Sequence, residues 1–375
     1  MTEIYLIRHI QAEGNIYRVM QGHFDGAVTA LGLRQVEALA ERFRDVKLDA
    51  LYSSDLHRAR VTASAVQKYH DLPLRTDPRL REINMGRWER RFFGDLLHEE
   101  PELLGTFMRH PSAWRLEGAE TFAEVAARVG SAVEEIARAH EGQSVAVVSH
   151  GVALLCLLTR LLDLGIDGGA ALPIAGNTAV THLFYDRGVF TVDYINDASH
   201  LAPLHLPAWE RSPDLYAVPL DPREERDYYC ACYADAWRAA HGSLRGYEPE
   251  VYLANAIEHH RADPKAVLKI LCGDEPMGLV DLDTRRGAGL GVGWVSLLYV
   301  APDYRRRGCG VQLLGRAVMR YRELGRRAVR LHAAEDNREA LAFYERQGFT
   351  VLSAEKTELG RLLLMEKKLG GPQDV

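Results

Sequence analysis

The chain has 375 residues, of which 47% are hydrophobic and 26% charged, and its formal net charge at pH 7 is −6. This composition is that of an ordinary globular protein of two domains, or three. The acidic balance excludes a general attraction to nucleic acid or to a membrane surface. No apolar run approaches the ~18 residues of a membrane span, and the chain enters a strand at once, which leaves no room for a signal peptide.

Five cysteines are an odd number and lack the Cys-x-x-Cys spacing of a zinc site. We therefore expect free thiols in a reducing compartment rather than a disulfide framework or a metal centre. The expected location is the cytoplasm.

Residues 1 to about 195 alternate buried-strand patterns with amphipathic helices whose apolar residues recur at spacings of three and four. The predicted strands are 4–7, 50–52, 144–148, 179–185 and 190–195, and the predicted helices are 31–43, 56–69, 121–140 and 152–162. This alternation predicts a largely parallel sheet with helices on both faces.

The segment 196–220 contains Pro203, Pro207, Pro213 and Pro219, which predict that no regular element forms there. We therefore expect one domain over residues 1–205, a proline-rich linker over 206–216 and a second domain over 217–375.

The second half has a different order of elements, with two helices before the first strand. The predicted helices are 223–240, 250–261, 309–324 and 338–347, and the predicted strands are 266–272, 276–283, 292–300, 328–333, 350–356 and 360–367. This order predicts a mixed α/β domain.

Two strands of the first half end on polar side chains, Arg8-His9 and Ser149-His150. Ligands of open α/β sheets bind outside the carboxyl ends of the strands. Arg58 opens a helix just after a short strand, where the positive helix end also favours an anion, and Glu82 lies in an irregular segment that could reach the same place. Imidazoles and guanidinium groups converging there suit phosphate.

These groups can hydrolyse a phosphomonoester without a metal ion. Neutral His9 can attack phosphorus in line and form a phosphohistidine, while Arg8, Arg58 and His150 hold the phosphoryl oxygens and stabilise the charge of the transition state. Glu82 would protonate the leaving oxygen and then activate the water that hydrolyses the intermediate.

The motifs of residues 1–200 resemble those of the histidine phosphatase superfamily, with its phosphoglycerate-mutase-like fold. The matching positions are Arg8-His9-Ile10, Asn15, Gln21-Gly22, Thr29, Gly32, Ser54 to Ala59, Leu80-Arg81-Glu82, Gly86, Trp88-Glu89 and Ser149-His150-Gly151. The resemblance implies a three-layer α/β/α sandwich, and phosphate contacts from Asn15 as well as from Arg8, Arg58 and His150. The domain is too short for the insertions of the glycolytic mutases, which favours a phosphatase.

Two positions depart from the family pattern, since Ile10 and Arg90 stand where glycine is usual. A β-branched residue does not readily take positive φ. If the family glycine serves backbone freedom, we expect an altered pocket at Ile10.

A second constellation follows the strand that ends at Val300, where Arg305-x-x-Gly308-x-Gly310 leads into a helix. The glycines allow consecutive N–H groups to point at one anion, and the helix dipole adds to this attraction. The loop therefore predicts a pyrophosphate cradle.

Together with the later segment 334–349, this loop resembles the GNAT family of N-acetyltransferases over about residues 215–370. The resemblance implies acetyl-CoA as the cofactor and a central strand that splays at a bulge. It places Leu298 and Val300 on the pantetheine arm, Asn337 beside the cofactor and Tyr344 as the acid for the departing thiolate. The remaining cofactor-binding positions that it implies are Arg305, Arg306, Arg307, Gly308, Cys309 and Gly310.

The base for the acetyl acceptor is left open by the sequence. Many relatives carry a carboxylate on the central strand, but this strand has Ser296, which cannot act as a base. The alternatives are a water relay or an acid such as Glu248 or Glu250.

The favoured interpretation is a bifunctional enzyme that hydrolyses a small phosphate ester and transfers acetyl from acetyl-CoA to an amine. Its partners would be these small molecules, with neither nucleic acid nor membrane. One alternative is a regulatory protein with one degenerate domain, and another is a phosphoglycerate-mutase-type phosphoryl transferase with an accessory acetyltransferase. The oligomeric state stays open, with a homodimer among the alternatives.

Overall fold

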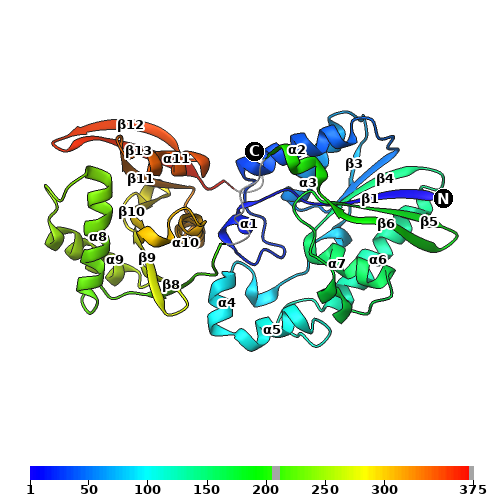
Figure 1. Cartoon of the computed structure of the whole chain (residues 1–375), viewed down its shortest axis with the longest axis horizontal. Coiled ribbons are helices and arrows are strands. Elements are labelled where there is room, and N and C mark those ends of the chain that lie inside the picture. Colours follow the sequence, from blue (N-terminus) through cyan, green and yellow to red (C-terminus); the bar gives the residue numbers. More distant parts are fainter. Residues whose placement is uncertain (205–211, 371–375) are drawn as a thin grey trace. The chain divides into compact units, whose positions relative to one another are not determined.

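A computed structural model describes residues 1–204 and 212–370. The chain divides into two compact units (Figure 1), here called the N-terminal and C-terminal domains. The N-terminal domain is built from most of residues 1–204, and the C-terminal domain from residues 212–370 with the short segments 16–18 and 92–98. No helix of these described residues is long and apolar enough to span a membrane. All five cysteines are free, as predicted.

The N-terminal domain contains a six-stranded sheet in the order β3-β2-β4-β1-β5-β6. Its strands are β1 (Thr2–Arg8), β2 (Ala50–Ser53), β3 (Leu74–Thr76), β4 (Ser144–Ser149), β5 (Val180–Asp186) and β6 (Val189–Asp197). The first four strands in this order run parallel, whereas β5 and β6 are antiparallel. The largely parallel sheet is therefore confirmed, with β3 as an additional strand that the sequence pattern missed.

Helices cover both faces of this sheet, which makes the predicted three-layer sandwich (Figure 1). The longer helices are α2 (Ala30–Phe43), α3 (His57–Gln67), α6 (Phe122–Ala139) and α7 (Gly151–Leu161), and the shorter ones are α1 (Glu13–Tyr17) and α5 (Pro101–Arg109). A further short helix, α4 (Phe93–Glu99), lies almost wholly in the segment 92–98 that groups with the C-terminal domain. The four long helices match the predicted ranges within one or two residues. The short helices were missed because one or two turns give too little periodicity to recognise.

The core of the sandwich explains why the strands read as continuous apolar runs. Ile7, Leu51 and Val148 point to one face and pack against α2 and α3, in a cluster with Leu39 and Phe43. Because successive side chains of a strand alternate between faces, the residues next to these in each strand pack against the helices on the opposite face of the sheet. In the central strands β1 and β4 both faces are buried, so the apolar run is continuous in each and ends on polar residues at its carboxyl end.

The proline-punctuated connection is more regular than predicted. Residues 206–211 of the predicted linker lie outside the described residues, but Ser199–Leu204 form a 3-10 helix that includes Pro203 and Tyr216–Pro219 form strand β7. The expectation that prolines prevent regular elements here was therefore wrong. β7 is an edge strand, and Pro219 is its last residue, where a missing N–H is tolerated.

The C-terminal domain contains a seven-stranded sheet in the order β12-β13-β11-β10-β9-β8-β7. After β7 its strands are β8 (Val267–Cys272), β9 (Glu275–Asp283), β10 (Val292–Val300), β11 (Ala328–Ala334), β12 (Thr350–Thr357) and β13 (Gly360–Lys368), and its helices are α8 (Arg226–His241), α9 (Pro249–Ala262), α10 (Cys309–Glu323) and α11 (Arg338–Arg346). β10 and β11 are parallel, and their neighbours pair antiparallel. The predicted mixed α/β domain is thus confirmed.

Arg90 has a φ of 68°, in the left-handed region that glycine occupies at least cost. The arginine in place of the usual glycine therefore keeps the glycine-like backbone. Its N–H donates to the carbonyl of Met20 over 2.9 Å, and its guanidinium lies 5.0 Å from the centre of the Phe24 ring. This cation–π contact partly offsets the strain of the backbone.

At this position we expect glycine to stabilise the fold more than alanine, the reverse of the usual order. We expect Arg90→Gly to be more stable than Arg90→Ala by roughly 1 kcal/mol, since only alanine keeps a Cβ at positive φ while both lose the contact with Phe24. The measurement is the urea concentration at which peptides of the N-terminal domain lose protection from hydrogen exchange. A more stable alanine variant would contradict the left-handed backbone at this position.

Candidate active sites

His9 and His150 follow directly on the paired ends of two neighbouring parallel strands. Arg8 of β1 is in register with Ser149 of β4, so the next residue of each strand emerges at the same edge of the sheet. The two imidazole rings have centroids 5.0 Å apart and are 2% and 0% exposed. The structure therefore brings together the two histidines that the sequence predicted as a pair.

The hydrogen bond of His9 selects which ring nitrogen can react. Its Nδ1 lies 2.6 Å from the carbonyl oxygen of Ile10, and a carbonyl can only accept, so Nδ1 carries the proton and donates it. The lone pair is then on Nε2. The next residue thus fixes the tautomer that a nucleophilic histidine needs.

The surroundings also keep both imidazoles uncharged. Burial lowers the pKa of His9 well below its usual range, and the positive charges of Arg58 and Arg8 lower it further. The pKa of His150 is lowered for the same reasons, burial first and then the charge of Arg58. Neutral imidazole at pH 7 leaves the Nε2 lone pair of His9 available for attack.

Arg58 is fully buried, and a loop from the preceding connection holds it. One terminal nitrogen donates to the Gly22 carbonyl over 2.8 Å, and the other donates over 3.0 Å to both the Phe24 carbonyl and the Asp25 carboxylate. Asp25 also accepts from the backbone N–H groups of His57 and Arg58 at the start of α3. One carboxylate thus caps the helix and orients the guanidinium that the helix presents.

Four nitrogen atoms around His9 are buried without a hydrogen-bond partner in the described parts of the chain. They are Nε of Arg8, Nε of Arg58 and both ring nitrogens of His150. Arg8 is oriented by a bond from Nη1 to the Ala175 carbonyl, which leaves Nε unused. Because a neutral imidazole has one N–H, three of these four nitrogens are donors without an acceptor. Such buried donors are rare and costly, so this group marks a place that an anion with several oxygens would complete.

Glu82 sits at the N-terminus of α7, directly beside this group. Its carboxylate accepts from the N–H groups of Val152 over 3.1 Å and Ala153 over 2.9 Å, and from its own neighbour Ile83 over 3.0 Å. Burial lowers the pKa of both Arg8 and Arg58, and the negative charge of Glu82 partly opposes this effect. The predicted acid therefore lies in the same site, held on the helix that begins after His150.

The loop before α10 curls as the second constellation predicted. Arg306 has a φ of 59° and Gly308 one of 79°, so two left-handed residues stand within three positions. Gly308 is the N-cap residue of α10, and Gly310 lies against the ring of Phe343, 3.5 Å from where a Cβ would stand. Left-handed residues of this kind allow successive N–H groups to point at one anion, so the loop is compatible with the predicted cradle, which stays a prediction.

Arg305 and Arg307 of this loop have different surroundings. Arg305 donates from Nε to the Val300 carbonyl and from Nη2 to Asp235, each over 2.9 Å, which ties the loop to β10 and α8. Arg307 lies 5.8 Å from the centre of the Tyr304 ring. The Cys309 thiol is buried, and burial raises its pKa to about 11, so it stays protonated.

β10 splays from β11 as the family resemblance implies. The parallel pairing runs from Val292 to Trp294, whereas pairing with β9 continues to Val300 and carries a bulge between Val295 and Leu297. Beyond Trp294 the β11 side of β10 has no strand partner within the described chain. Backbone groups of this stretch, including Leu298, are therefore open to an extended ligand.

Asn337 and Tyr344 lie on α11 with different kinds of support. Asn337 caps the helix, because its Oδ1 accepts from the Ala340 N–H over 3.1 Å. Tyr344 packs between Phe343 and Phe349, with ring centroids 5.2 and 5.4 Å away. Burial raises the pKa of Tyr344 to about 12, which keeps the phenol protonated at neutral pH.

Neither predicted alternative for the acceptor's base is positioned by a specific contact that points to catalysis. Glu250 forms an exposed ion pair with Arg226, and Glu248 is the exposed N-cap residue of α9. The most deeply buried carboxylate among the described residues of this domain is Asp281 of β9, 1% exposed, which accepts from His259 over 2.7 Å and Tyr229 over 2.8 Å. It joins α8 and α9 to the sheet.

The carboxylates around His259 account for the direction in which its pKa is shifted. Burial acts to lower the pKa of His259, but its hydrogen bonds to Asp281 and Asp283 and the charges of these carboxylates outweigh burial and raise the pKa. Within residues 1–204 and 212–370, no group of three or more His, Cys, Asp or Glu side chains is arranged to hold a metal ion. The expected absence of a metal stays a prediction.

Comparison with known proteins agrees with these two sites. Residues 4–198 match the model of the Histidine phosphatase superfamily (branch 1). The chain belongs to this superfamily. Residues 225–349 match the Acetyltransferase (GNAT) family, so a GNAT domain follows the histidine phosphatase domain in one polypeptide.

The relatives of the phosphatase domain cover it from end to end. A protein of Yersinia pestis (strain Pestoides F) called "Probable phosphoglycerate mutase GpmB" is 32% identical over 210 residues, which are 56% of this chain and 97% of that protein. The solved structure of Bacillus stearothermophilus YhfR has 34% identity and a TM-score of 0.52, and the match covers 54% of this chain and 100% of that one.

Two residues singled out in the phosphatase domain have local backbone roles. Asn15 accepts from the Ala12 N–H over 2.9 Å, within the turn that opens α1, and its phosphate contact stays a prediction. Ile10 is fully buried and its φ is not positive, so this backbone does not require glycine. Its N–H donates to the Thr62 hydroxyl over 2.8 Å. Backbone freedom is therefore no reason for glycine at this position, and the altered pocket that we expected at Ile10 stays a prediction.

Sequence reasoning missed the residues that hold the reactive groups in place. Asp25 orients Arg58, and Asn177 donates over 2.9 Å to the His9 carbonyl. His23 bonds through Nε2 to the Glu82 carbonyl over 2.8 Å. Glu89 in turn accepts from the His23 N–H over 2.8 Å. The Trp88-Glu89 motif was the one signal that could have indicated such support.

The lowered pKa values of His9 and His150 make a prediction for the phosphate-free enzyme. Both imidazoles should remain neutral as pH falls through 6.5, where an ordinary histidine becomes charged. Because the unfolded chain then binds protons that the folded site does not, this pair makes stability decrease as pH falls below 6.5. Two-dimensional NMR of ¹⁵N-histidine-labelled protein, assigned with His9→Asn and His150→Asn, measures the protonation directly.

Adding inorganic phosphate is the matched control for this titration. A bound dianion should raise both pKa values, because it places negative charge beside the rings. Midpoints near 6.5 for both histidines without phosphate would contradict the burial and charge described above.

Proposed function

We propose that the histidine phosphatase domain hydrolyses phosphomonoesters of small molecules through a phosphohistidine at His9. The observation that carries this proposal is the set of four buried, unpartnered nitrogens of Arg8, Arg58 and His150 around a neutral imidazole. The phosphoryl oxygens would accept from these donors. Such preorganised donors stabilise developing charge without further rearrangement.

In the first step, the Nε2 lone pair of His9 attacks phosphorus and the bond from phosphorus to the ester oxygen breaks. Glu82, whose carboxylate takes up a proton as the negatively charged ester binds beside it, gives this proton to the leaving alkoxide, which departs as an alcohol. The carbonyl of Ile10 holds Nδ1–H throughout, and this bond strengthens as the ring gains positive charge.

In the second step, water attacks the phosphohistidine and the N–P bond breaks. Glu82, now ionised, takes the proton of this water, so the enzyme returns to its starting protonation state and releases inorganic phosphate. The N–H groups of Val152 and Ala153 keep the carboxylate in one orientation for both steps.

A phosphoglycerate-mutase-type transfer is the second candidate for this domain, favoured by the name of the Yersinia relative at 32% identity. It shares the phosphohistidine and differs in the group that attacks it, a substrate hydroxyl instead of water. Trapping phospho-His9 does not separate the two. Release of inorganic phosphate from a single ester, with no transfer to added phosphoglycerate, supports the hydrolase.

For the GNAT domain we propose acetyl transfer from acetyl-CoA to the amine of a small molecule. The N–H groups of residues 306–310 would bind the pyrophosphate, and the open backbone of β10 near Leu298 would pair with the pantetheine arm. Asn337 would then act on the cofactor indirectly, by fixing the start of α11.

Tyr344 would donate a hydrogen bond to the departing sulfur. Its pKa of about 12 lies above the ~8.5 of an ordinary thiol, so complete proton transfer to a free thiolate is uphill. A hydrogen bond that strengthens as negative charge develops on sulfur still favours the transition state.

We further propose that both domains are active, that no metal takes part and that the enzyme works in the cytoplasm on small molecules. The regulatory alternative drew on the substitution at Ile10, but the local backbone accommodates isoleucine without positive φ. That alternative now rests on the missing carboxylate of the central strand.

Reciprocal variants test the two assignments in one full-length protein. His9→Ala should lower hydrolysis of nitrophenyl phosphate by roughly 10⁴-fold or more, because it removes the nucleophile, and leave acetyl transfer unchanged. Tyr344→Phe should lower the kcat of acetyl transfer by roughly 10–100-fold and leave hydrolysis unchanged. Mass spectrometry of acid-quenched enzyme should locate labile phosphate on His9 and on no other residue.

Glu82→Gln tests the acid. Hydrolysis of an alkyl phosphate should fall by ~10²–10⁴-fold, whereas hydrolysis of nitrophenyl phosphate should fall far less, since a good leaving group needs little protonation. Comparing the two substrates also controls for misfolding, because a misfolded variant would lose activity on both. Equal losses on both would remove Glu82 from the role of acid.

A further inference from the structure

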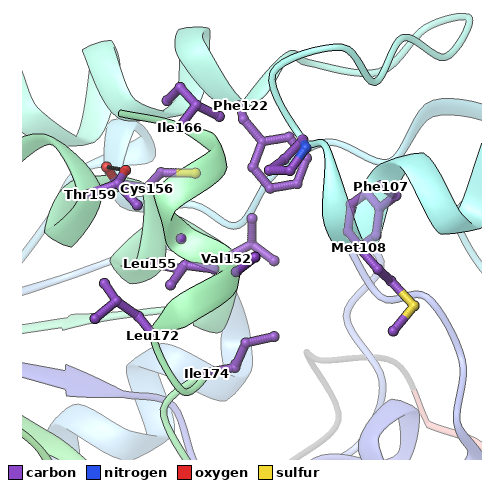
Figure 2. A pocket seen from close by; sticks show the side chains of 13 residues that line it. Phe107, Met108, Phe122, Val152, Leu155, Cys156, Thr159, Ile166, Leu172 and Ile174 are labelled. Atoms are coloured by element: carbon purple, nitrogen blue, oxygen red, sulfur yellow. Dashed lines mark hydrogen bonds between the residues drawn. The ribbon is translucent and has the colours of Figure 1, made fainter. Parts of the chain in front are cut away.

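A cavity of about 170 Å³ lies in the histidine phosphatase domain along one side of α7 (Figure 2). Apolar side chains make up most of its lining. Phe107 and Met108 of α5 face Val152 and Leu155 of α7 across it, and Ile174 lies at its edge. Among the described residues that line it, none is charged, and Thr159 contributes the hydroxyl.

The cavity shares residues with the catalytic site. Val152 lines it and also donates its N–H to Glu82, the proposed acid. Ile174 lines it and is followed by Ala175, whose carbonyl orients Arg8. A Cβ built on Gly151, the residue after His150, would lie 3.3 Å from Ile174 Cγ2 and 3.4 Å from Arg8 Cζ. The cavity therefore adjoins the residues that position Glu82 and Arg8.

The far wall of the cavity is a rigid aromatic cluster. Phe107 and Phe122 both line the cavity with ring centroids 5.3 Å apart, and Trp114 packs 5.1 Å from Phe107 and 5.9 Å from Phe122. Trp88 closes the cluster behind them, 5.6 Å from Trp114, and both tryptophans are fully buried. Packed rings hold one rotamer each, so this wall is formed before any ligand arrives.

Two apolar side chains at the cavity are exposed to solvent. Met108 is 53% exposed and Ile174 57%, although both stand beside an apolar space. Single exposed apolar residues are common on protein surfaces. Here two of them flank an apolar cavity that adjoins a reactive group, which is the arrangement of a preformed ligand site.

We propose that this cavity binds the apolar part of the substrate's alcohol, so that the preferred substrates are phosphate esters of alcohols with one aromatic ring or a short branched alkyl chain. This inference rests on the phosphatase activity proposed above. The size agrees, because an apolar cavity of ~150 Å³ accommodates benzene. Release of the alcohol would then return apolar surface to water at each turnover.

The lining also disfavours the polar alternatives. The carboxylate of a phosphoglycerate needs a cation or several N–H donors once it is removed from water, and no charged side chain lines the cavity. The hydroxyls of a sugar would have the single hydroxyl of Thr159 as a side-chain partner. An aromatic or alkyl group gives up no hydrogen bonds to water when it enters the cavity.

Two primary alkyl phosphates with similar leaving groups test the inference, 2-phenylethyl phosphate and ethyl phosphate, with 3-phosphoglycerate as a third substrate. Burial of the ring should raise kcat/KM for the phenylethyl ester by roughly 10–100-fold over the ethyl ester. 3-Phosphoglycerate should be no better than the ethyl ester. Equal or reversed preference, with all three hydrolysed, overturns the cavity assignment and leaves the phosphatase intact.

Binding of the two matching phosphonates, measured by calorimetry, separates the cavity from the chemistry. These analogues cannot be hydrolysed, so a tighter Kd for 2-phenylethylphosphonate than for ethylphosphonate supports the cavity even if no ester is turned over, an outcome that would overturn only the proposed function. Identical Kd values for the two phosphonates overturn the cavity assignment.

A pair of surface variants ties the preference to this place. Met108→Gln should reduce the phenylethyl-to-ethyl ratio of kcat/KM about threefold or more, because it makes the mouth polar. Leu33→Gln is the matched control, since Leu33 is 55% exposed and lies on α2, away from the cavity lining. A ratio that Met108→Gln leaves unchanged, or that Leu33→Gln lowers equally, contradicts the assignment.

Discussion

The phosphatase site depends on one unfavourable feature, the burial of hydrogen-bond donors that the described chain does not satisfy. Each unpaired nitrogen on Arg8, Arg58 and His150 costs about 1–3 kcal/mol. The cost is tolerated because each side chain is held elsewhere, Arg58 by Asp25 and two carbonyls, and Arg8 by Ala175. A phosphoryl group offsets the deficit, so the same strain that lowers the stability of the empty domain becomes affinity for the transition state.

The two domains present donors to phosphate groups in different ways, and the difference fits what each phosphate does. In the phosphatase domain the donors are side chains, two of them with full positive charge, directed at a phosphorus whose bonds change. In the GNAT domain the proposed donors are backbone N–H groups of a loop with left-handed residues at Arg306 and Gly308. Partial charges suffice there, because the pyrophosphate of a cofactor only has to be held and released.

Sequence reasoning succeeded where a pattern has one physical meaning. Apolar runs that end on His9 and His150 can only be buried strands, and parallel neighbours bring such ends together, as the register of Arg8 with Ser149 shows. It failed where partners are distant or are backbone atoms. The carbonyls of Gly22 and Phe24 carry no sequence signal, and the separation of Asp25 from Arg58 gave no reason to pair them. The sequence also did not show that Asn15 and Asn337 form local hydrogen bonds, in which the side-chain amide caps the turn that contains it.

The first turn of helix α7 holds the proposed acid, whereas one side of the same helix lines the cavity that we propose selects the substrate. Its first turn supplies the N–H groups for Glu82 immediately after His150. Val152, Leu155, Cys156 and Thr159, spaced three and four residues apart, form one continuous stripe along the cavity. Only Val152 takes part in both, and it does so through its backbone N–H, which any residue but proline provides. Divergence of this stripe could therefore move such an enzyme from one ester to another by point substitutions, with the reacting groups inherited unchanged.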